Sequence, residues 1–299
     1  MDRRYMKQTP AISIIVLNYN TSDLLGGALE SIAATTDNLP VETVVIDNAS
    51  TDGGFSHIAQ KFEHDPRFKF VQNKKNTGLA AVNSMLKATK GKYIMTMDAD
   101  ARLHAHTLQL LAGFLDATPG AGAATANLLN PDGSEQRYFR RLMTPFTGFF
   151  STVLGRAIDK YLLNLRYYKR YHYEGTELVG VTEIEQPSVT CLMLRRGAFG
   201  SYIIDPETPF YFTDVGLCKR IYERGYRIYL LPDASTTHFK STSFNKMKNK
   251  WRTREYYRSL MVYFRKHYPL HAPMMWLVLW LDRIMRYTLL YTTGREPMR

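Results

Sequence analysis

The sequence predicts an α/β fold in which a mostly parallel sheet carries helices on both faces. Short apolar runs suited to buried strands alternate with segments of helical spacing, an order that produces parallel strands. Polar clusters follow the strand-like runs, and ligands of such sheets bind outside the carboxyl ends of the strands. With 299 residues, 45% of them hydrophobic, the chain can bury the core of one large α/β unit with an appendage.

The N-terminal elements can be assigned in chain order. Residues 12–17 form a continuous apolar run, as expected for a strand buried on both faces. Residues 23–34 have the apolar spacing of a helix, with Ser22 or Asp23 as its cap. The next elements are expected to be strand, strand, helix and strand, at residues 41–46, 68–71, 80–90 and 93–97, with the helix ending at Gly91.

A polar cluster follows each of the first three strands. These clusters are Asn18-Tyr19-Asn20, Asp47 with the residues after it, and Asn76-Thr77-Gly78. The Asp47 carboxylate can accept a hydrogen bond from the imide N–H of a nucleobase, and Tyr19 offers an aromatic face nearby. The backbone N–H groups of the third cluster suit phosphate oxygens. Asp52 and Gly53 are better interpreted as a turn or helix cap than as ligands.

Asp98 and Asp100 follow the fourth strand and are separated by one small residue. Residues spaced in this way point to the same side of an extended chain, so both carboxylates can face one cation. Divalent cations such as Mg²⁺ and Mn²⁺ prefer carboxylate ligands and bridge diphosphate oxygens. Acidic pairs are also common in surface turns, but the position at a fourth strand end favours a metal site.

The net charge of +12 indicates an anionic partner, such as a nucleotide or acidic lipid headgroups. We expect no nucleic-acid binding, because the charge is concentrated beside an apolar tail and not on a recognition motif. Cys191 and Cys218 stand in apolar settings without metal-ligand spacing, which predicts a reducing compartment. The first ten residues lack the apolar segment of a secretory signal, so a cytoplasmic protein is expected.

Four N-terminal blocks, taken together and in order, resemble family 2 glycosyltransferases. They are residues 13–20 (SIIVLNYN), 45–52 (VIDNASTD), 76–80 (NTGLA) and 97–100 (MDAD). The similarity extends over residues 10–268 and is closest to the rhamnosyltransferase-like branch that builds bacterial surface polysaccharides. It implies the Rossmann-like GT-A fold, a nucleotide-diphosphate sugar donor, Mg²⁺ or Mn²⁺ as cofactor, and inversion of the anomeric carbon.

The resemblance also implies roles for individual residues. Asp47 matches the residue that contacts the base, and Asp98 and Asp100 match the metal-binding pair, with Asp98 also near the donor. His238 stands where many members place a histidine that reaches the metal or diphosphate. The other donor contacts fall on Asn18, Tyr19, Asn20, Asn76 and Gly78.

Residues 210–220 (FYFTDVGLCKR) align with the family pattern Phe-x-x-Glu-Asp-x-Asp-Leu-x-x-Arg. Asp214 falls on the general base, a role that typically contributes ~10²–10⁴-fold to a rate. Thr213 and Gly216 replace the other two acids of the pattern, which implies an altered acceptor side. From local pattern alone, Asp214 can also be interpreted as the cap of a helix over residues 215–224.

Basic segments occur in the second half of the chain. Arg140 and Arg141 can pair with a donor or acceptor diphosphate, or belong to a solvated loop. Between Lys240 and Lys266 there are nine Lys/Arg and a single acid, with interleaved aromatic residues. This pattern predicts one basic amphipathic helix at a membrane surface.

The apolar run at residues 274–281 is too short to span a bilayer, which needs ~20 apolar residues. On a helix, an aromatic and aliphatic stripe typical of the membrane interface would form from Trp276, Trp280, Ile284, Tyr287 and Tyr291. We therefore expect peripheral attachment to the inner face of the plasma membrane through residues 246–292. The alternative is a helix packed on the catalytic domain or on a second subunit, which leaves a homodimer open.

Together these observations predict a catalytic domain at residues 1–245, with a donor half at 10–130 and an acceptor half at 131–245, and a basic helical region at 246–299. The favoured function is inverting sugar transfer from dTDP-rhamnose or a UDP-sugar. The acceptor would be a glycan or a polyprenyl-diphosphate-linked sugar in O-antigen, capsule or cell-wall synthesis. Two alternatives remain: a non-catalytic or weakly active nucleotide-sugar-binding protein, and a nucleotide-sugar nucleotidyltransferase, whose Gly-rich N-terminal loop is missing here.

Overall fold

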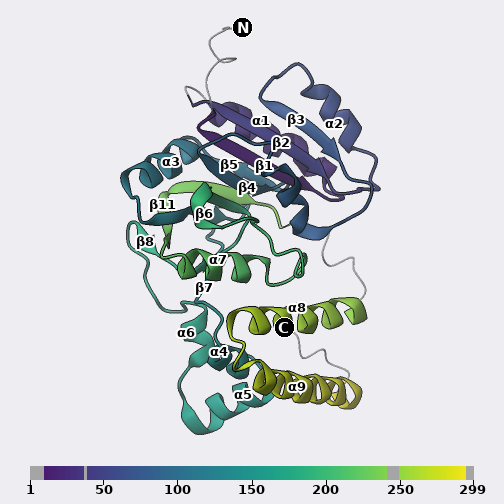
Figure 1. Ribbon diagram of the computed structural model, residues 1–299, viewed down its shortest axis with the longest axis vertical. Coiled ribbons are helices and arrows are strands. Elements are labelled where there is room, and N and C mark those ends of the chain that lie inside the picture. The colour runs from purple at the N-terminus through teal and green to yellow at the C-terminus, as the bar shows by residue number, and fades with distance from the viewer. Residues whose placement is uncertain (1–9, 37–38, 241–248, 294–299) are drawn as a thin grey trace.

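The computed structural model describes residues 10–36, 39–240 and 249–293. Figure 1 shows a sheet with helices on both sides as the upper body of the molecule and a smaller helical layer below it. The N-terminal residues 1–9, on which the expectation of a missing secretory signal rests, lie outside the described residues.

The strands have the following bounds: β1 (Ile12–Asn18), β2 (Val41–Asp47), β3 (Phe68–Gln72), β4 (Tyr93–Asp98), β5 (Ala101–Leu103), β6 (Ala121–Leu129), β7 (Phe139–Arg140), β8 (Thr182–Glu183), β9 (Gln186–Pro187), β10 (Cys191–Arg195) and β11 (Arg227–His238). Nine strands form the central sheet, in the order β3-β2-β1-β4-β10-β6-β11-β5, with β8 paired to β11. β1, β2, β3, β4, β6 and β11 run in one direction, and β5, β8 and β10 run against them. The mostly parallel α/β sheet expected from the sequence is therefore confirmed.

The helices have the following bounds: α1 (Ser22–Thr35), α2 (Phe55–Lys61), η2 (Gly78–Met85), α3 (Thr107–Ala117), α4 (Pro145–Phe150), α5 (Val153–Ile158), η3 (Asp159–Leu163), α6 (Tyr167–Tyr171), η4 (Arg196–Ala198), α7 (Thr213–Glu223), α8 (Asn249–His267) and α9 (Ala272–Thr293). α1, α2 and α3 cover one face of the sheet, where Leu29 packs in the same core as Ile14. η2 and α7 cover the other face, where Leu217 packs in the same core as Ile15. Successive strand residues point to opposite faces, and both faces are buried, so the strand β1 is apolar apart from Ser13 and the terminal Asn18.

The helix expected at residues 80–90 is wrong in both type and length. The chain instead forms η2, a 3₁₀ helix that ends at Met85. The Asn83 side chain accepts hydrogen bonds from the backbone N–H groups of Ile203 and Ile204 and donates one to the Ile204 carbonyl, at 2.9, 3.1 and 2.6 Å. These long-range bonds pin the middle of the segment to another loop, a constraint that local apolar spacing does not reveal.

A helical layer below α7 combines α4, α5, η3 and α6 with the C-terminal helices α8 and α9 (Figure 1). Its buried core contains Tyr257 and Phe264 of α8 and Met275 of α9, which pack in one cluster with Phe212 and Val215 at the start of α7. The apolar face of α8, which was expected to lie on a membrane surface, is thus packed inside the protein. Because α4–α6 share this layer, the domain boundary at residue 245 stays a prediction.

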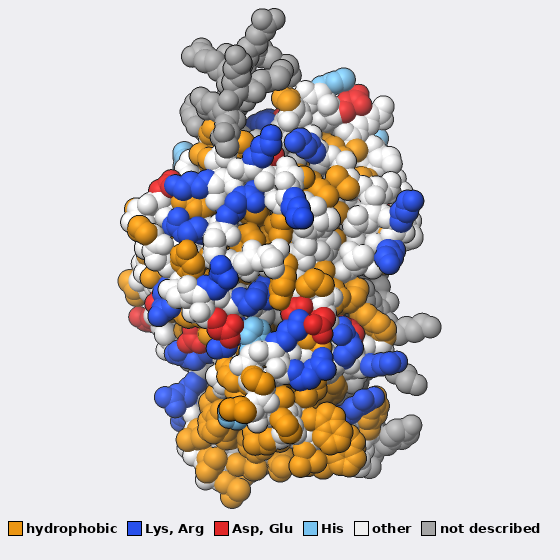
Figure 2. Space-filling model, viewed as in Figure 1, with side chains coloured by type: hydrophobic (Ala, Val, Ile, Leu, Met, Phe, Trp, Pro, Cys, Tyr) orange, Lys and Arg blue, Asp and Glu red, His pale blue; other side chains and the backbone are white. Residues whose placement is uncertain are grey.

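The lower end of the molecule is covered by apolar side chains, with Lys and Arg side chains above them (Figure 2). On α9, Trp276 and Trp280 are 57% and 49% exposed, and on η3, Tyr161 and Leu162 are 74% and 78% exposed. We call this the apolar base, which consists of the exposed side chains of α4–α6 and the outer face of α9. Within the described part of the chain, every helix is too short or too polar to cross a membrane. Residues 241–248, which belong to the predicted amphipathic helix, and the side chain of Tyr291, which belongs to the predicted membrane segment, lie outside the described residues.

Candidate functional site

The polar clusters predicted after β1 and β2 lie side by side because the two strands are parallel neighbours and Asn18 is in register with Asp47. Both side chains are buried. The Asn18 amide donates to the Asp47 carboxylate at 2.9 Å, and Gln72 at the end of β3 donates to the same carboxylate at 3.2 Å. The Asp47 carboxylate is therefore oriented before any ligand arrives, which suits a group that recognises a base.

The loops after β1 and β2 are tied together around Asn20. Its side-chain Oδ1 accepts from the Thr51 N–H at 2.7 Å, and its backbone N–H donates to Ser50 Oγ at 2.9 Å. Tyr19 is half-buried in the same loop. Asp52 accepts from the backbone N–H and the hydroxyl of Ser22 at the start of α1, both at 3.0 Å. Asp52 thus ties its loop to the first turn of α1, although the N-cap residues of α1 and α2 are Thr21 and Gly54.

Asn48 holds the third loop, a role that the sequence analysis missed. Its amide donates to Asn76 Oδ1 at 2.9 Å and to the Gly78 carbonyl at 3.0 Å, and its oxygen accepts from the Thr77 N–H at 3.2 Å. Gly78 has φ +64°, and a Cβ there would lie 2.4 Å from the Pro209 carbonyl oxygen, so no larger residue fits.

Two of the three N–H groups expected to meet phosphate are engaged within the protein. The Thr77 N–H donates to Asn48 Oδ1 at 3.2 Å, and the Gly78 N–H donates to Asn76 Oδ1 at 2.8 Å. The structure therefore gives Asn76 and Gly78 a role in shaping the loop, while their contact with a donor sugar nucleotide stays a prediction.

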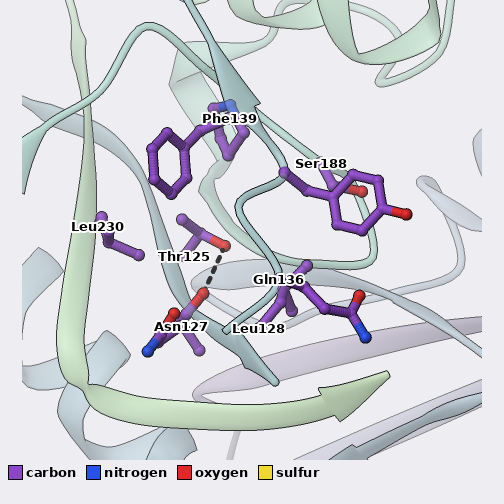
Figure 3. Close-up of a pocket in the computed structure, with 10 residues that line it drawn as sticks. Thr125, Asn127, Leu128, Gln136, Phe139, Ser188 and Leu230 are labelled. Atoms are coloured by element: carbon purple, nitrogen blue, oxygen red, sulfur yellow. Dashed lines mark hydrogen bonds between the residues drawn. The ribbon is translucent and has the colours of Figure 1, made fainter. Parts of the chain in front are cut away.

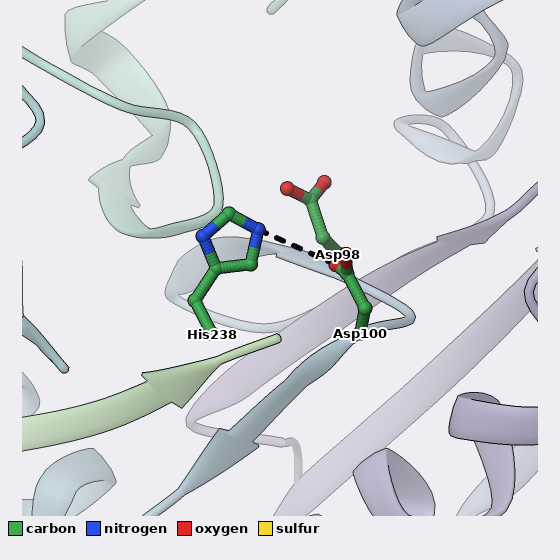
Figure 4. A group of neighbouring side chains, drawn as sticks. All are labelled: Asp98, Asp100 and His238. Atoms are coloured by element: carbon green, nitrogen blue, oxygen red, sulfur yellow. Dashed lines mark ion pairs between the residues drawn. The ribbon is translucent and has the colours of Figure 1, made fainter. Parts of the chain in front are cut away.

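Asp98, Asp100 and His238 lie together at the end of β4 (Figure 4). One ligand atom from each lies within 4.8 Å of the others. His238 Nε2 is 3.5 Å from the Asp100 carboxylate. β11, which carries His238, runs antiparallel to β5, and its pairing places His238 opposite Ala101, directly after Asp100. The structure thus brings together the three metal-site residues predicted from the sequence.

The electrostatics of this cluster fit a divalent cation. Burial raises the pKa of Asp98, and the nearby charge of Asp100 raises it further. Burial alone would lower the pKa of His238, but its hydrogen bond with Asp100 and the charges of both carboxylates raise it above the ordinary value. Two close carboxylates without a counter-charge are costly, and a bound cation would remove that cost. Oxygen and imidazole donors together suit Mn²⁺, and the carboxylates alone suit Mg²⁺.

Two residues that position the cluster were missed. Thr190 Oγ1 donates to Asp98 at 2.8 Å. The Gln136 side-chain oxygen lies 3.0 Å from His238 Nδ1, and its amide donates to the His238 carbonyl at 2.6 Å. Gln136 and Ser188 also line a small cavity of about 10 Å³ beside β6 (Figure 3). Neither residue could be recognised from the sequence, because a polar side chain that faces a distant segment leaves no local pattern.

Asp214 lies in the first turn of α7 and is half-buried. The residue at the N-cap position is Phe212, with φ 59°, and no side chain caps the helix. Asp214 is therefore not the cap, and the capping alternative is wrong. Among the described residues its carboxylate accepts one hydrogen bond, from Gln186 Nε2 at 3.3 Å, which leaves lone pairs for another donor.

Gly216, which stands where the family pattern has an acid, lies one helical turn before Arg220. Arg220 Nε and Nη1 are buried and have no hydrogen-bond partner among the described residues. A Cβ at Gly216 would lie 3.5 Å from Arg220 Nη1, the distance of an ordinary contact. The acid that the family pattern places here would thus stand beside an unsatisfied guanidinium.

The side chains of Arg140 and Arg141 have different surroundings in the structure. They are neighbours at the end of β7, so their side chains point to opposite sides. Arg141 forms an ion pair with Glu185 at 3.1 Å and lies over the ring of Tyr173 at 4.6 Å. Arg140 instead lines a cavity between α7 and the helical layer. A phosphate contact therefore suits Arg140, while Arg141 has a structural role.

Comparison with known proteins agrees with this geometry. The model of glycosyl transferase family 2 matches residues 13–201. An N-acetylglucosaminyl-diphospho-decaprenol L-rhamnosyltransferase from Mycobacterium tuberculosis is 24% identical over 248 residues, which cover 79% of this chain and 78% of that protein. Other glycosyltransferase relatives match over shorter stretches, which cover 27% and 29% of their own length.

Solved structures show the same fold. Residues 1–349 of TarS from S. aureus, in complex with UDP-GlcNAc, superpose with a TM-score of 0.55 at 19% identity, covering 88% of this chain and 70% of that chain. GalNAc-T7 with UDP, GalNAc and Mn²⁺ gives a TM-score of 0.57 at 13% identity, covering 86% and 48%. Both comparisons support the GT-A fold.

Proposed function

The chain belongs to glycosyl transferase family 2, and from that premise we propose that it catalyses inverting transfer of a sugar from a nucleotide-diphosphate donor. The observation that carries the proposal is the cluster of Asp98, Asp100 and His238 beside the oriented Asp47 carboxylate, all at the carboxyl ends of β1, β2 and β4 or next to them. This arrangement suits a nucleotide-diphosphate sugar whose nucleobase meets Asp47 and whose diphosphate lies near Asp98, Asp100 and His238.

The proposed reaction is a single displacement. An acceptor hydroxyl oxygen attacks the anomeric carbon and forms the new C–O bond, while the bond to the diphosphate oxygen breaks and its electron pair leaves with the nucleoside diphosphate. Asp214 takes the proton of the hydroxyl, and its single hydrogen bond from Gln186 keeps the carboxylate directed and available. A divalent cation held by Asp98, Asp100 and His238 would stabilise the charge on the leaving diphosphate.

The donor and acceptor belong to the same proposal. dTDP-rhamnose is supported by the rhamnosyltransferase relative, and a UDP-sugar is supported by the structural neighbour with UDP-GlcNAc. The relative's name also supports an acceptor on a polyprenyl diphosphate. Such a product would enter a cell-surface polysaccharide.

We further propose attachment to the inner face of the plasma membrane through the apolar base. Trp276, Trp280 and Ile284 of the expected stripe are exposed on α9, which supports the part of the proposal that concerns residues 272–292. The apolar face of α8, the helix before α9, packs inside the protein and therefore takes no part in the proposed attachment. A homodimer through the apolar base remains the alternative use of this surface.

A donor panel tests the proposal. Purified protein with Mn²⁺ is offered dTDP-, UDP- and GDP-sugars, and donor binding is followed by thermal shift and turnover by release of the nucleoside diphosphate. We expect one donor to raise the melting temperature and to be consumed with a polyprenyl-diphosphate-linked acceptor. Asp214→Asn should lower the transfer rate by ~10²–10⁴-fold and leave donor binding unchanged.

Asp132→Asn is the control, because Asp132 is exposed in a loop and its side chain accepts hydrogen bonds from the backbone N–H and hydroxyl of Ser134, two residues later. If the wild type binds a donor but Asp214→Asn transfers as fast as the wild type, Asp214 is not the base. If the wild type binds a donor without consuming it, the protein is the non-catalytic alternative.

A further inference from the structure

A cavity of about 330 Å³ lies between the start of α7 and the helical layer, away from the Asp98–Asp100 cluster. This volume falls in the range of sites for small ligands, ~300–1,000 Å³. Three arginines line it: Arg140 from β7, Arg156 from α5 and Arg286 from α9. Segments far apart in the sequence therefore supply three cations to one small space.

The cavity carries more positive than negative charge. Arg286 pairs with the buried Asp282 at 2.9 Å, and Asp282 is further held by hydrogen bonds from Tyr257 and from the Val153 N–H, both at 2.7 Å. Among the described residues, neither Arg140 nor Arg156 forms an ion pair with a carboxylate. Asp214 lies near the cavity wall, since the pKa of Tyr171 is raised by burial and, to a smaller extent, by the charge of Asp214.

His172 also lines the cavity, and its pKa reflects the positive charge there. Burial and the charges of Arg140 and Arg156 lower its pKa to about 4, so its imidazole is neutral near pH 7. Tyr168 and Tyr171 also line the cavity, and Arg156 lies over the Tyr168 ring at 5.0 Å. Like charges that face one space repel each other, and an anion bound between them removes the repulsion. The guanidinium groups match phosphate oxygens in geometry as well as charge.

The cavity lies between Asp214, the proposed general base, and the apolar base. Phe212 and Val215 line it on the side of α7, and they flank Asp214 in the sequence. On the opposite side, Arg156 and Tyr168 belong to α5 and α6, whose exposed apolar side chains form part of the apolar base (Figure 2). A ligand with a sugar at one end, an anionic group in the middle and a lipid chain at the other end would therefore fit this surface. Its sugar would lie near Asp214, its anionic group between the arginines, and its lipid chain on the apolar base.

We propose that this cavity binds the diphosphate of a lipid-linked acceptor, with the lipid chain on the apolar base and the acceptor sugar directed towards Asp214. The inference rests on the proposed function, because it assigns a binding site to the acceptor of that reaction. The diphosphate bridge fixes the distance between lipid and sugar, so a site for it would also fix which hydroxyl reaches the carboxylate. Arg140 and Arg156 are positioning residues in this scheme.

Binding is tested on the whole protein by calorimetry in EDTA, so that no cation can recruit a diphosphate to Asp98 and Asp100. The probes are farnesyl diphosphate, farnesol and inorganic pyrophosphate. We expect saturable binding of farnesyl diphosphate and at least about tenfold weaker binding of the other two probes. Farnesol lacks the diphosphate, and inorganic pyrophosphate lacks the lipid chain. Arg140→Gln and Arg156→Gln should each weaken farnesyl diphosphate binding by on the order of tenfold, the effect of losing one charge-assisted contact.

Arg283→Gln is the matched control, since Arg283 is exposed on the same helix as Arg286 and lies over the Tyr287 ring, outside the cavity. It removes the same charge and should change binding by less than about twofold. Circular dichroism and melting temperature confirm that each variant is folded. Arg286 is not substituted, because Asp282 would lose its partner in the interior.

Several results would overturn the proposal. Equal affinity for farnesol and farnesyl diphosphate would reduce the site to an apolar surface, and equal affinity for pyrophosphate would make it a site for free phosphates. Binding that is equal in Arg140→Gln, Arg156→Gln and Arg283→Gln would place the ligand elsewhere. Because these measurements need no nucleotide sugar, they succeed or fail independently of the donor panel that tests the proposed function.

Discussion

The carboxyl edge of the sheet and the helical layer below it are built in opposite ways. At the sheet edge, short polar side chains follow successive strands, and hydrogen bonds between neighbouring loops hold them, as between Asn18 and Asp47. In the helical layer, large aromatic and aliphatic side chains from α7, α8 and α9 pack together, and the polar groups gather around one cavity. The first region is ordered by strand pairing and the second by side-chain packing.

This difference indicates which part of the molecule is specialised. A site held by strand ends needs little besides the sheet, so the same donor geometry can serve many members of the family. In the proposed acceptor site, by contrast, binding would depend on particular side chains of packed helices, such as Arg156 and Tyr168. If the two regions are independent, a substitution in one should leave the other unchanged.

The largest expected effect concerns the core of the helical layer. Phe264 is completely buried, and Phe264→Ala should lower the free energy of unfolding by about 3–5 kcal/mol, as large aromatic deletions in cores do. Urea unfolding measures this change, and donor affinity at low temperature should stay at the wild-type value. Leu270→Ala is the control, because Leu270 is 92% exposed and its loss should cost less than about 0.5 kcal/mol. A parallel loss of donor affinity would mean that the two regions are coupled.

The sheet edge should respond in the opposite sense. Asp98→Asn keeps the shape and the hydrogen bond with Thr190 but removes one of two close charges, so the cation-free protein should become more stable. Mn²⁺-dependent transfer should fall by about 100-fold or more, because the leaving diphosphate loses its stabilisation. Thermal unfolding in EDTA and transfer assays with Mn²⁺ measure the two changes. A lower melting temperature in EDTA would give Asp98 a structural role instead.

A smaller effect is expected where α7 joins the two regions. Gly216→Asp supplies a carboxylate beside the buried and unsatisfied Nη1 of Arg220, and should raise the free energy of unfolding by about 1–2 kcal/mol. Gly216→Ala is the control, since it improves helix propensity without adding the ion pair. Chemical unfolding of both variants separates the two contributions. An aspartate variant no more stable than the alanine variant would show that Arg220 is satisfied by water.

The smallest effect is a pH dependence in the cavity. Because the folded pKa of His172 is lowered to about 4, the unfolded chain binds a proton at pH values where the folded chain does not. Stability from this group is therefore present above about pH 6.5 and is lost as the pH falls towards 4, with a slope below about 1.4 kcal/mol per pH unit. Unfolding as a function of pH, compared between the wild type and His172→Gln, isolates the contribution. Equal slopes in the two proteins would contradict it.

The fold and the donor side could be predicted from the sequence to a large extent. β1, β2, β3 and β4 begin at the residues expected and end within one residue of the expected ends. Asp98, Asp100 and His238 meet as the family resemblance implied. The signal was strong because a parallel sheet buried on both faces gives continuous apolar runs, and its ligand residues directly follow them.

The helical layer could be predicted only in part. The amphipathic pattern of α8 was visible, but the pattern is the same whether the apolar face meets a membrane or the protein, and here Tyr257, Leu260 and Phe264 meet the protein. The short helices α4–α6 gave no signal, because each is too short to show a helical period. The cavity was invisible for the same reason, apart from Arg140.

The strands of the sheet and the loops at its carboxyl edge could be recognised from the chain alone, because apolar periodicity and positions at strand ends are local properties. The roles of His238 and Asp214 were implied by the family resemblance. Contacts in the folded protein show that Asp214 is not a helix cap, that α8 packs inward, and that Arg140, Arg156 and Arg286 face one cavity. Those outcomes depend on contacts between segments far apart in the sequence, and such contacts leave no periodic pattern in the chain.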